Sequence, residues 1–252
     1  MLAYQIKIAL KSLRRNPALS ALVICGIGLG IAVSTAFITT YYLMAGDPIP
    51  LKSDRLFYVE IDAWDPEYPF DEEHPERPPN QITYRDLRGL MESGIPTYQS
   101  GMFKSSLTIQ PEGEDDRPYR ARTRMCFSDF FQMFEVPFQY GGGWGPSVDE
   151  NQEPVVVIDR ETNQRLFGGE DSVGSKVRIN NRDFTVVGVV GDWRPDIKYY
   201  DLNNSPVEAP EEIYIPFNQL EAMEISSTGS SMGWKFYPGT VYQGFLPSDS
   251  TW

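Results

Sequence analysis

The longest apolar stretch of the chain lies near its N-terminus. No charged residue occurs from Asn16 to Gly46, and the run from Ala18 to Ala45 consists almost entirely of apolar and small residues. A helix of about 20 residues crosses the hydrocarbon core of a bilayer, so this run is long enough to span it with some tilt. Tyr41 and Tyr42 stand near its far end, where membrane proteins are enriched in aromatic residues. The pattern predicts a transmembrane helix over residues 18–45.

A cleaved secretory signal is the alternative interpretation of this run. Leu43-Met44-Ala45 resembles a weak cleavage site. The apolar region of a signal peptide is about 7–15 residues long, however, and this run is about twice that length. We therefore favour an uncleaved helix.

The residues before the apolar run alternate between apolar and basic at helical spacing. Residues 1–17 are expected to form an amphipathic segment on the cytoplasmic membrane face, which ends at Asn16-Pro17. A plain basic tail is the alternative. Basic residues stay on the cytoplasmic side, so the N-terminus is predicted to be cytoplasmic and residues 46–252 extracytoplasmic. The residues that set this topology, and face the membrane interface, are Lys7, Lys11, Arg14 and Arg15.

Small residues recur along one row of the predicted membrane helix. Gly26 and Gly30 form a GxxxG pair, and Ser34 continues the row. Such a row lets two helices approach closely in lipid, so these three residues are predicted to pack against another helix. The alternative is that glycine is simply frequent in membrane helices.

Short strand and helix patterns alternate through the rest of the chain. The class is therefore predicted to be α+β, with one N-terminal transmembrane helix followed by a mixed α+β extracytoplasmic domain of two subdomains. An Asn180-Asn181 turn predicts a hairpin. Strands are expected at residues 56–61, 97–110, 117–126, 155–158, 176–179, 183–190 and 213–215, and helices at 83–91, after Ser128, and at 160–167. The helix that Ser128 is expected to cap carries Phe130, Phe131 and Phe134, which are predicted to be core residues.

The distribution of charge excludes one class of partner. The chain has a net charge of -13, and its first 16 residues carry four basic and no acidic residues, so the remainder carries -17. Nucleic-acid binding depends on basic surfaces that neutralise phosphates, so nucleic acid is not expected as a partner.

The sequence offers little chemistry for catalysis, and no catalytic, cofactor-binding or metal-binding residues are predicted. His74 is the only histidine, and Cys25 and Cys126 lie far apart in sequence. Gly169–Lys176 (GEDSVGSK) approaches a phosphate-binding loop, but its Ser and Lys are in the wrong order and a strand is expected to follow.

Arg120, Arg122 and Arg124 alternate along one predicted strand and share a face. This face would suit an anion, but we favour a solvated face near the neighbouring acidic residues.

Four stretches resemble the permease subunits of MacB/FtsX-type ABC transporters, with their MacB-like periplasmic core domain. The first runs from Ile8 to Phe37, with Arg-Arg-Asn-Pro before a glycine-rich membrane helix. The others are Phe127–Trp144, Pro154–Trp193 and Glu212–Leu220. Their order and spacing carry the resemblance, which covers about half the chain. The turn Asp171-Ser172-Val173, with Ser175, departs from the usual pattern.

This resemblance implies a role in the bacterial inner membrane. The permeases of the family pair with a second copy or a paralogue, bind a cytoplasmic ATPase subunit that hydrolyses ATP, contact membrane lipid and, in some systems, a periplasmic adaptor protein. The family carries four membrane helices and this sequence shows one, so it looks like the N-terminal part of a permease. The competing hypothesis is a single-pass anchored binding or scaffold domain without transport activity.

Overall fold

The computed structural model describes residues 15–46, 49–62, 71–79, 81–111, 117–193, 198–201 and 208–225, together with Tyr4, Glu67, Pro69 and Pro195. The chain divides into two compact units, Met1–Asp47 and Pro48–Trp252.

The described part of the first unit consists mainly of one long helix, α2, from Pro17 to Ala45. Its part from Pro17 to Tyr42 is long and apolar enough to cross a membrane, and none of it is buried within the protein. Pro17 is at the first helical position, where its missing N–H is not needed. Residues 18–45 are helical as predicted, and their placement across a membrane stays a prediction. The predicted amphipathic segment lies almost entirely outside the described residues.

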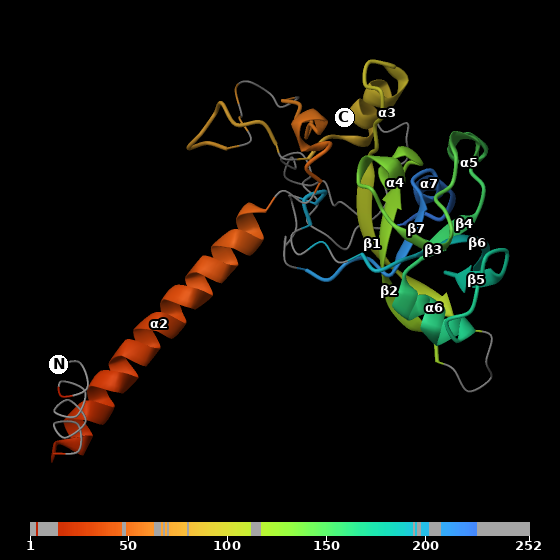
Figure 1. Cartoon of the computed structure of the whole chain (residues 1–252). Coiled ribbons are helices and arrows are strands. Elements are labelled where there is room, and N and C mark those ends of the chain that lie inside the picture. The colour runs from red at the N-terminus through yellow and green to blue at the C-terminus, as the bar shows by residue number, and fades with distance from the viewer. Residues whose placement is uncertain are drawn as a thin grey trace, which may run out of the picture. The chain divides into compact units, whose positions relative to one another are not determined.

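The second unit is built on one seven-stranded sheet (Figure 1). Its strands are β1 (Met102–Gln110), β2 (Tyr119–Cys126), β3 (Phe138–Gly141), β4 (Val155–Ile158), β5 (Lys176–Ile179), β6 (Arg182–Val190) and β7 (Ile213–Pro216). The order is β3-β6-β4-β7-β2-β1-β5, and β5 also pairs with β6. Six of the strands therefore close on themselves, and β3 extends β6. Closure removes free strand edges and favours one stiff body.

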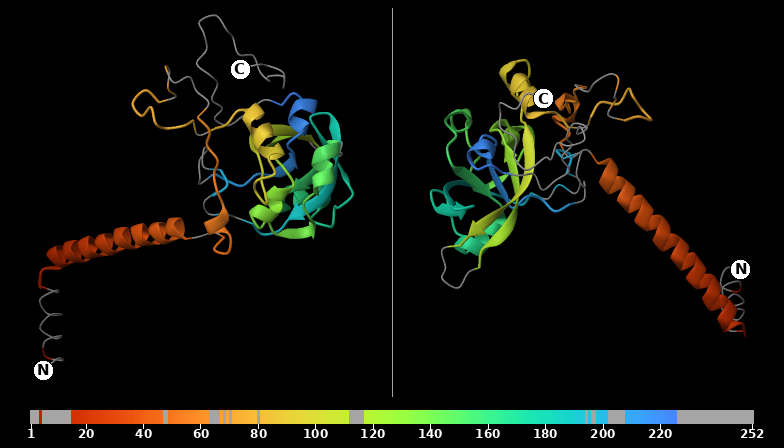
Figure 2. Two further views of the ribbon diagram at one scale, coloured as in Figure 1. Left: turned by 90° about the horizontal axis from the view of Figure 1, so that it is seen from above. Right: turned by 180° about the vertical axis from the view of Figure 1, so that it is seen from behind.

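Short helices lie before, between and after the strands, mostly at the two ends of the sheet (Figures 1 and 2). They are η1 (Ser53–Arg55), α3 (Tyr84–Glu92), α4 (Asp129–Met133), α5 (Pro146–Asn151), α6 (Arg160–Phe167) and α7 (Gln219–Ala222). β2 and β7 run parallel, so α4 and α7, which follow them, begin at the same end. β4 runs antiparallel to β7, so α6 begins at the opposite end.

Apolar residues pack on both faces of the sheet. Strand β7 shows the division: Ile213 and Ile215 belong to one buried cluster and Tyr214 to the other. The first cluster is mainly aliphatic and includes Ile109, Met125, Val156, Ile158 and Ile179, together with Phe184. The second is aromatic and includes Phe130, Phe131, Phe134, Trp144, Tyr200 and Tyr214. Alternate residues of a strand point to opposite faces, so strands between two cores become apolar throughout, as in β4.

Several predicted elements are confirmed, some to the residue. β4, β5 and α6 have the predicted bounds, and the hairpin turns at Asn180 and Asn181, whose φ values of 46° and 66° are those of a tight hairpin turn. The α6 helix is capped by Asp159, which accepts a hydrogen bond from the Thr162 amide at 2.7 Å. Phe130, Phe131 and Phe134 are buried, at 0%, 6% and 3% exposed.

Other predictions were wrong. Residues 56–61 are extended but make no strand ladder within the described part of the chain. Ser128 precedes α4 without a side-chain capping bond, and α4 has five residues only. Strand β3 and helices α5 and α7 were not predicted. A division into two subdomains is not seen, because the chain from Pro48 onward forms one unit.

Candidate functional site

The predicted helix-packing residues lie on α2, spaced one turn apart. A Cβ atom added to Gly26 or Gly30 would meet nothing within 4 Å among the described residues, and Ser34 is exposed. The side chains of this row project little from the helix, so another helix backbone could approach closely along it. Its packing role remains a prediction.

The predicted topology residues are only partly described. Arg15 is exposed and lies two residues before the start of α2. Lys7, Lys11 and Arg14 lie outside the described residues. Their role in orientation remains a prediction.

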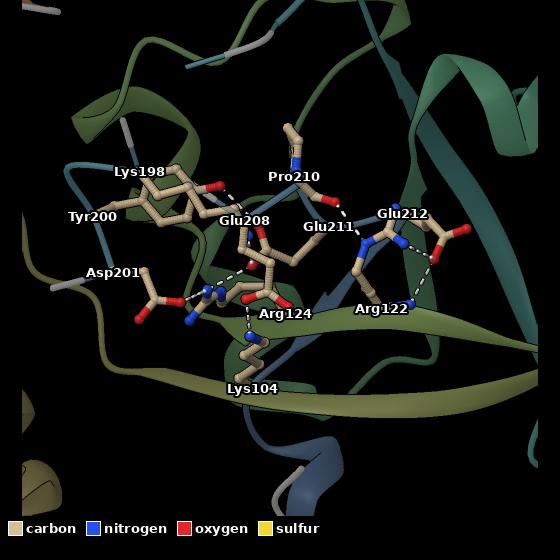
Figure 3. Close-up of polar contacts among 10 residues, drawn as sticks. All are labelled: Lys104, Arg122, Arg124, Lys198, Tyr200, Asp201, Glu208, Pro210, Glu211 and Glu212. Atoms are coloured by element: carbon tan, nitrogen blue, oxygen red, sulfur yellow. Dashed lines mark hydrogen bonds and ion pairs between the residues drawn. The ribbon is translucent and has the colours of Figure 1, made fainter. Parts of the chain in front are cut away.

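A buried group of charged residues, which we call the polar cluster, lies on the aromatic face of the sheet (Figure 3). At its centre is Arg124 on β2, which is 3% exposed. Its Nη2 donates to Glu211 Oε1 at 2.5 Å and also to Asp201. Lys198 Nζ donates to the same Glu211 oxygen at 3.1 Å, and the Tyr200 hydroxyl donates to the other Glu211 oxygen at 2.8 Å.

Charges in the polar cluster balance one another. Burial opposes the charge on Arg124, but the carboxylates of Glu211 and Asp201 outweigh burial and raise the pKa of the guanidinium. Burial likewise works against the Glu211 carboxylate, but Arg124 and Lys198 outweigh it and hold the pKa of Glu211 below its ordinary value. Burial, together with Glu211, raises the pKa of Tyr200. Both directions favour the ionised forms of Arg124 and Glu211. The polar cluster thus brings two basic side chains, Arg124 and Lys198, against two acidic ones, Asp201 and Glu211.

Further contacts beside the polar cluster bind the same stretch of chain. Lys104 on β1 pairs with Glu208. Arg122 donates from Nε to the Pro210 carbonyl at 3.0 Å and from its backbone amide to Glu212 at 2.8 Å. Residues 198–201 and 208–212 precede β7, so these contacts hold both short stretches against β1 and β2 (Figure 3). The arrangement is suited to fixing the chain and offers no activated nucleophile.

Arg120, Arg122 and Arg124, which were predicted to share one strand face, lie in three different environments. Arg120 is exposed and donates to the Ser106 hydroxyl at 3.1 Å and to its carbonyl at 2.9 Å. Arg122 is partly exposed and pairs with Glu212 at 3.4 Å. The expectation of a solvated face is wrong for Arg124, which is the centre of the polar cluster. No shared anion site is formed by these three side chains.

Among the residues that the structure describes, the remaining reactive side chains do not assemble into a site. His74 Nδ1 lies 3.7 Å from Glu76 in an exposed loop, and no metal-binding group of His, Cys, Asp and Glu occurs in the described residues. Burial raises the pKa of the Cys126 thiol, which stays protonated and free. Gly174 has a φ of 89° in a turn that leads into strand β5, and not into the helix that a phosphate-binding loop requires.

Comparison with known families assigns the chain. The profile of the MacB-like periplasmic core domain matches residues 20–242, which is most of the chain. The chain belongs to this family. The resemblance to MacB/FtsX-type permeases noted from the sequence is thereby confirmed.

Individual relatives match over shorter stretches. The macrolide export ATP-binding/permease protein MacB of Photorhabdus laumondii is 32% identical over 65 residues, which are 25% of this chain and 10% of that protein. A probable export ATP-binding/permease protein of Pseudomonas fluorescens is 38% identical over 64 residues, also 25% of this chain and 10% of that protein. The aligned part thus spans only about a tenth of the length of these curated relatives.

Solved structures with a similar arrangement come from two transporters. The extracellular domain of the noncanonic ABC-type transporter YknZ from Gram-positive bacteria has 19% identity and a TM-score of 0.44, covering 61% of this chain and 72% of that one. The periplasmic region of MacB from Actinobacillus actinomycetemcomitans has 17% identity and a TM-score of 0.43, covering 61% and 64%.

The family assignment settles the class of protein at a coarse level. This is a domain of ABC transporter permeases and not an enzyme domain. A periplasmic domain behind one apolar N-terminal helix fits an inner-membrane protein with an extracytoplasmic domain.

Proposed function

We propose that this chain is a permease component of a MacB/FtsX-type ABC transporter, in which ATP hydrolysis by a separate cytoplasmic subunit moves the extracytoplasmic domain. The N-terminus lies in the cytoplasm, and residues 46–252 lie on the other side of the membrane. The movement drives export or extraction of a substrate.

The observation that carries the proposal is the extent of the family match. The match begins at residue 20, inside α2, and continues through the second unit to residue 242. The membrane helix and the external domain are therefore parts of one family unit, as a coupling role requires. A soluble binding domain attached to an unrelated anchor would not produce a match that begins within the helix.

The proposal that a separate subunit hydrolyses ATP rests on two further observations. The curated relatives carry both "ATP-binding" and "permease" in their names. In this chain the one stretch that approaches a phosphate-binding loop, Gly169–Lys176, leads into a strand. The names link permeases of this kind to ATP binding, and we propose that a separate subunit supplies the hydrolysis to this chain.

The fold supports mechanical coupling through a stiff external domain. The closed strand order leaves few free edges, and the polar cluster fixes the connection between β6 and β7 to the sheet. Displacing a body of this kind moves all of it together. A second permease copy or a paralogue, packed on the Gly26 row, would complete the membrane part.

Affinity purification from native membranes tests the proposal. The full chain, tagged at its C-terminus, is extracted in mild detergent and its partners are identified by mass spectrometry. We expect an ABC ATPase subunit to co-purify and the complex to hydrolyse ATP, with an unrelated single-pass protein of the same membrane as control. Purification without any ATPase would contradict the proposal and favour the single-pass scaffold.

A further inference from the structure

The residues that directly follow α2 in sequence form a short two-sided segment, residues 49–59. One side is fixed to the domain. Ile49 is 5% exposed, and Leu56 packs against the aromatic cluster. Lys52 Nζ donates to the Gln132 carbonyl at 2.6 Å and lies 3.3 Å from the Glu135 carboxylate.

The other side of this segment presents large apolar side chains to the surroundings. Leu51 is 82% exposed and Phe57 is 80% exposed. Backbone hydrogen bonds from Lys52 and Ser53 to the Ile49 carbonyl fold the start of the segment into a turn, and Phe57 follows two residues after η1. Single exposed apolar residues are ordinary, but Leu51 and Phe57 lie within seven residues of one another on a segment whose Ile49, Lys52 and Leu56 are fixed to the domain.

Covalent geometry keeps this surface close to the end of α2. Leu51 is six residues beyond Ala45, the last residue of α2, and six extended residues span at most about 20 Å. Tyr41 and Tyr42, in the last turns of α2, have the position of an interfacial aromatic belt. If α2 spans the bilayer, Leu51 cannot leave the neighbourhood of the membrane surface.

The charge along the chain changes sign just after this segment. Residues 49–59 carry Lys52, Arg55 and one acid, Asp54. Residues 60–76 carry eight acidic residues and no Lys or Arg. An anionic lipid surface attracts the first stretch and repels the second, so the charge pattern selects the same segment as the apolar surface does.

We infer that Leu51 and Phe57 insert into the headgroup region of the outer leaflet and rest the external domain on the membrane. The inference depends on the membrane placement of α2 in the proposed function. The occupant is lipid, since the surface follows the membrane helix and its charge fits an anionic bilayer. The contact would set the angle at which the domain stands on the membrane and would have to yield when the domain moves.

Spin-label accessibility in lipid nanodiscs tests this inference on the full chain. The nanodiscs contain phosphatidylethanolamine and phosphatidylglycerol. Cys25→Ser removes the exposed thiol of α2, and Cys126, which is fully buried, is retained. Labels are placed through Leu51→Cys and Phe57→Cys. Val33→Cys on α2 is the lipid control, and Val173→Cys, 43% exposed in the loop before β5, is the aqueous control.

The ratio of collisions with oxygen to collisions with a nickel chelate separates the outcomes. We expect the labels at 51 and 57 to show a ratio several-fold higher than the label at 173 and close to that at 33. Nickel-accessible labels at 51 and 57 beside a lipid-exposed label at 33 would overturn the inference and leave the membrane placement intact. Spin–spin broadening between two chains at position 57 would show a second copy there and would also overturn it. Nickel accessibility at 33 would refute the membrane placement itself.

Discussion

Arg124 on β2 and Glu211, 87 residues further along the chain, form a buried ion pair in which the two side chains are 3% and 0% exposed. Glu211 lies two residues before β7, which pairs in parallel with β2. The ion pair therefore fixes the end of a long connection to the strand beside which the chain then continues. This contact links two parts of the domain that only the fold brings together.

Glu211→Gln is expected to lower the free energy of unfolding at pH 7 by about 3 kcal/mol. The change leaves Arg124 and Lys198 buried with one carboxylate fewer, and breaking a buried pair costs about 3–5 kcal/mol. Thermal unfolding of the full chain in detergent measures the loss. Asp183→Asn is the matched control, because the Arg178–Asp183 pair is exposed at 3.7 Å and worth at most about 1 kcal/mol. Equal effects of the two variants would contradict a structural role for the polar cluster.

The same variant has a predicted pH dependence. The folded-state pKa of Glu211 is lowered, so its stabilising contribution is fully present above the ordinary glutamate pKa and is lost as the pH falls toward the folded value. The ordinary value is about 4.3. The stability difference between the parent and Glu211→Gln should therefore be constant near neutral pH and shrink below about pH 4. A difference that grows with acidification would show that the sign of the shift is wrong.

Phe130→Ala is expected to cost about 3–5 kcal/mol of stability, the usual result of truncating a buried Phe. Phe130 is fully buried, with ring centroids 4.9 Å from Phe134 and 5.5 Å from Tyr200. Ile95→Ala is the control, since Ile95 is 87% exposed and its truncation should change stability by no more than about 0.5 kcal/mol. If Phe130→Ala melts like the parent, the short helix α4 does not belong to the core.

Local patterns explain what could be predicted of the fold. The β4 run Val155–Ile158 is apolar throughout because it is buried on both faces. Helix α6 has its cap Asp159 and its stop Gly168, which takes a left-handed φ of 66°. The Asn180-Asn181 turn defines a hairpin by itself. Each of these signals acts over a few residues, so the sequence alone contains it.

The polar cluster and the sheet closure could not be predicted, because both depend on distant pairings. An arginine on a strand face is ordinarily solvated, and nothing near Arg124 in sequence indicates that Asp201 and Glu211 will bury it. The short strand β3 pairs with the end of β6, about 50 residues later, and carries little hydrophobic periodicity of its own. The prediction for residues 56–61 was wrong for the converse reason. Their composition is typical of a strand, but they pair with no other strand in the described part of the chain.

Gly26→Leu and Gly30→Leu are expected to block helix association in the membrane. Without a side chain at these positions two backbones can approach and gain van der Waals contact, and lipid provides no hydrophobic drive to replace it. Disulfide cross-linking through Ser34→Cys in native membranes, with Cys25→Ser, measures association. Leu29→Ile, which lies off the row, should be mild. Equal cross-linking in all variants would mean that the glycines are background composition.

Changing Lys7, Lys11, Arg14 and Arg15 together to Glu is expected to scramble the topology. Basic residues next to a membrane helix are retained on the cytoplasmic side, and this chain has no other charge before Asp47. A reporter fused after Trp252 that is active only outside the cytoplasm measures orientation. Changing the same four residues to another basic type is the control. Unchanged outward placement in the Glu variant would contradict the assigned orientation.

The central claim, that ATP hydrolysis in the cytoplasm moves the external domain, is tested most directly by energy transfer between the domain and the bilayer. The complex with its co-purified ATPase is labelled through Val173→Cys, in the Cys25→Ser background, and reconstituted with acceptor-labelled lipid. We predict that transfer efficiency changes when ATP is trapped with vanadate and returns after release, and that an ATPase-inactive partner abolishes the change. Identical efficiency in the nucleotide-free, ATP and vanadate states, with ATPase activity intact, would contradict the account.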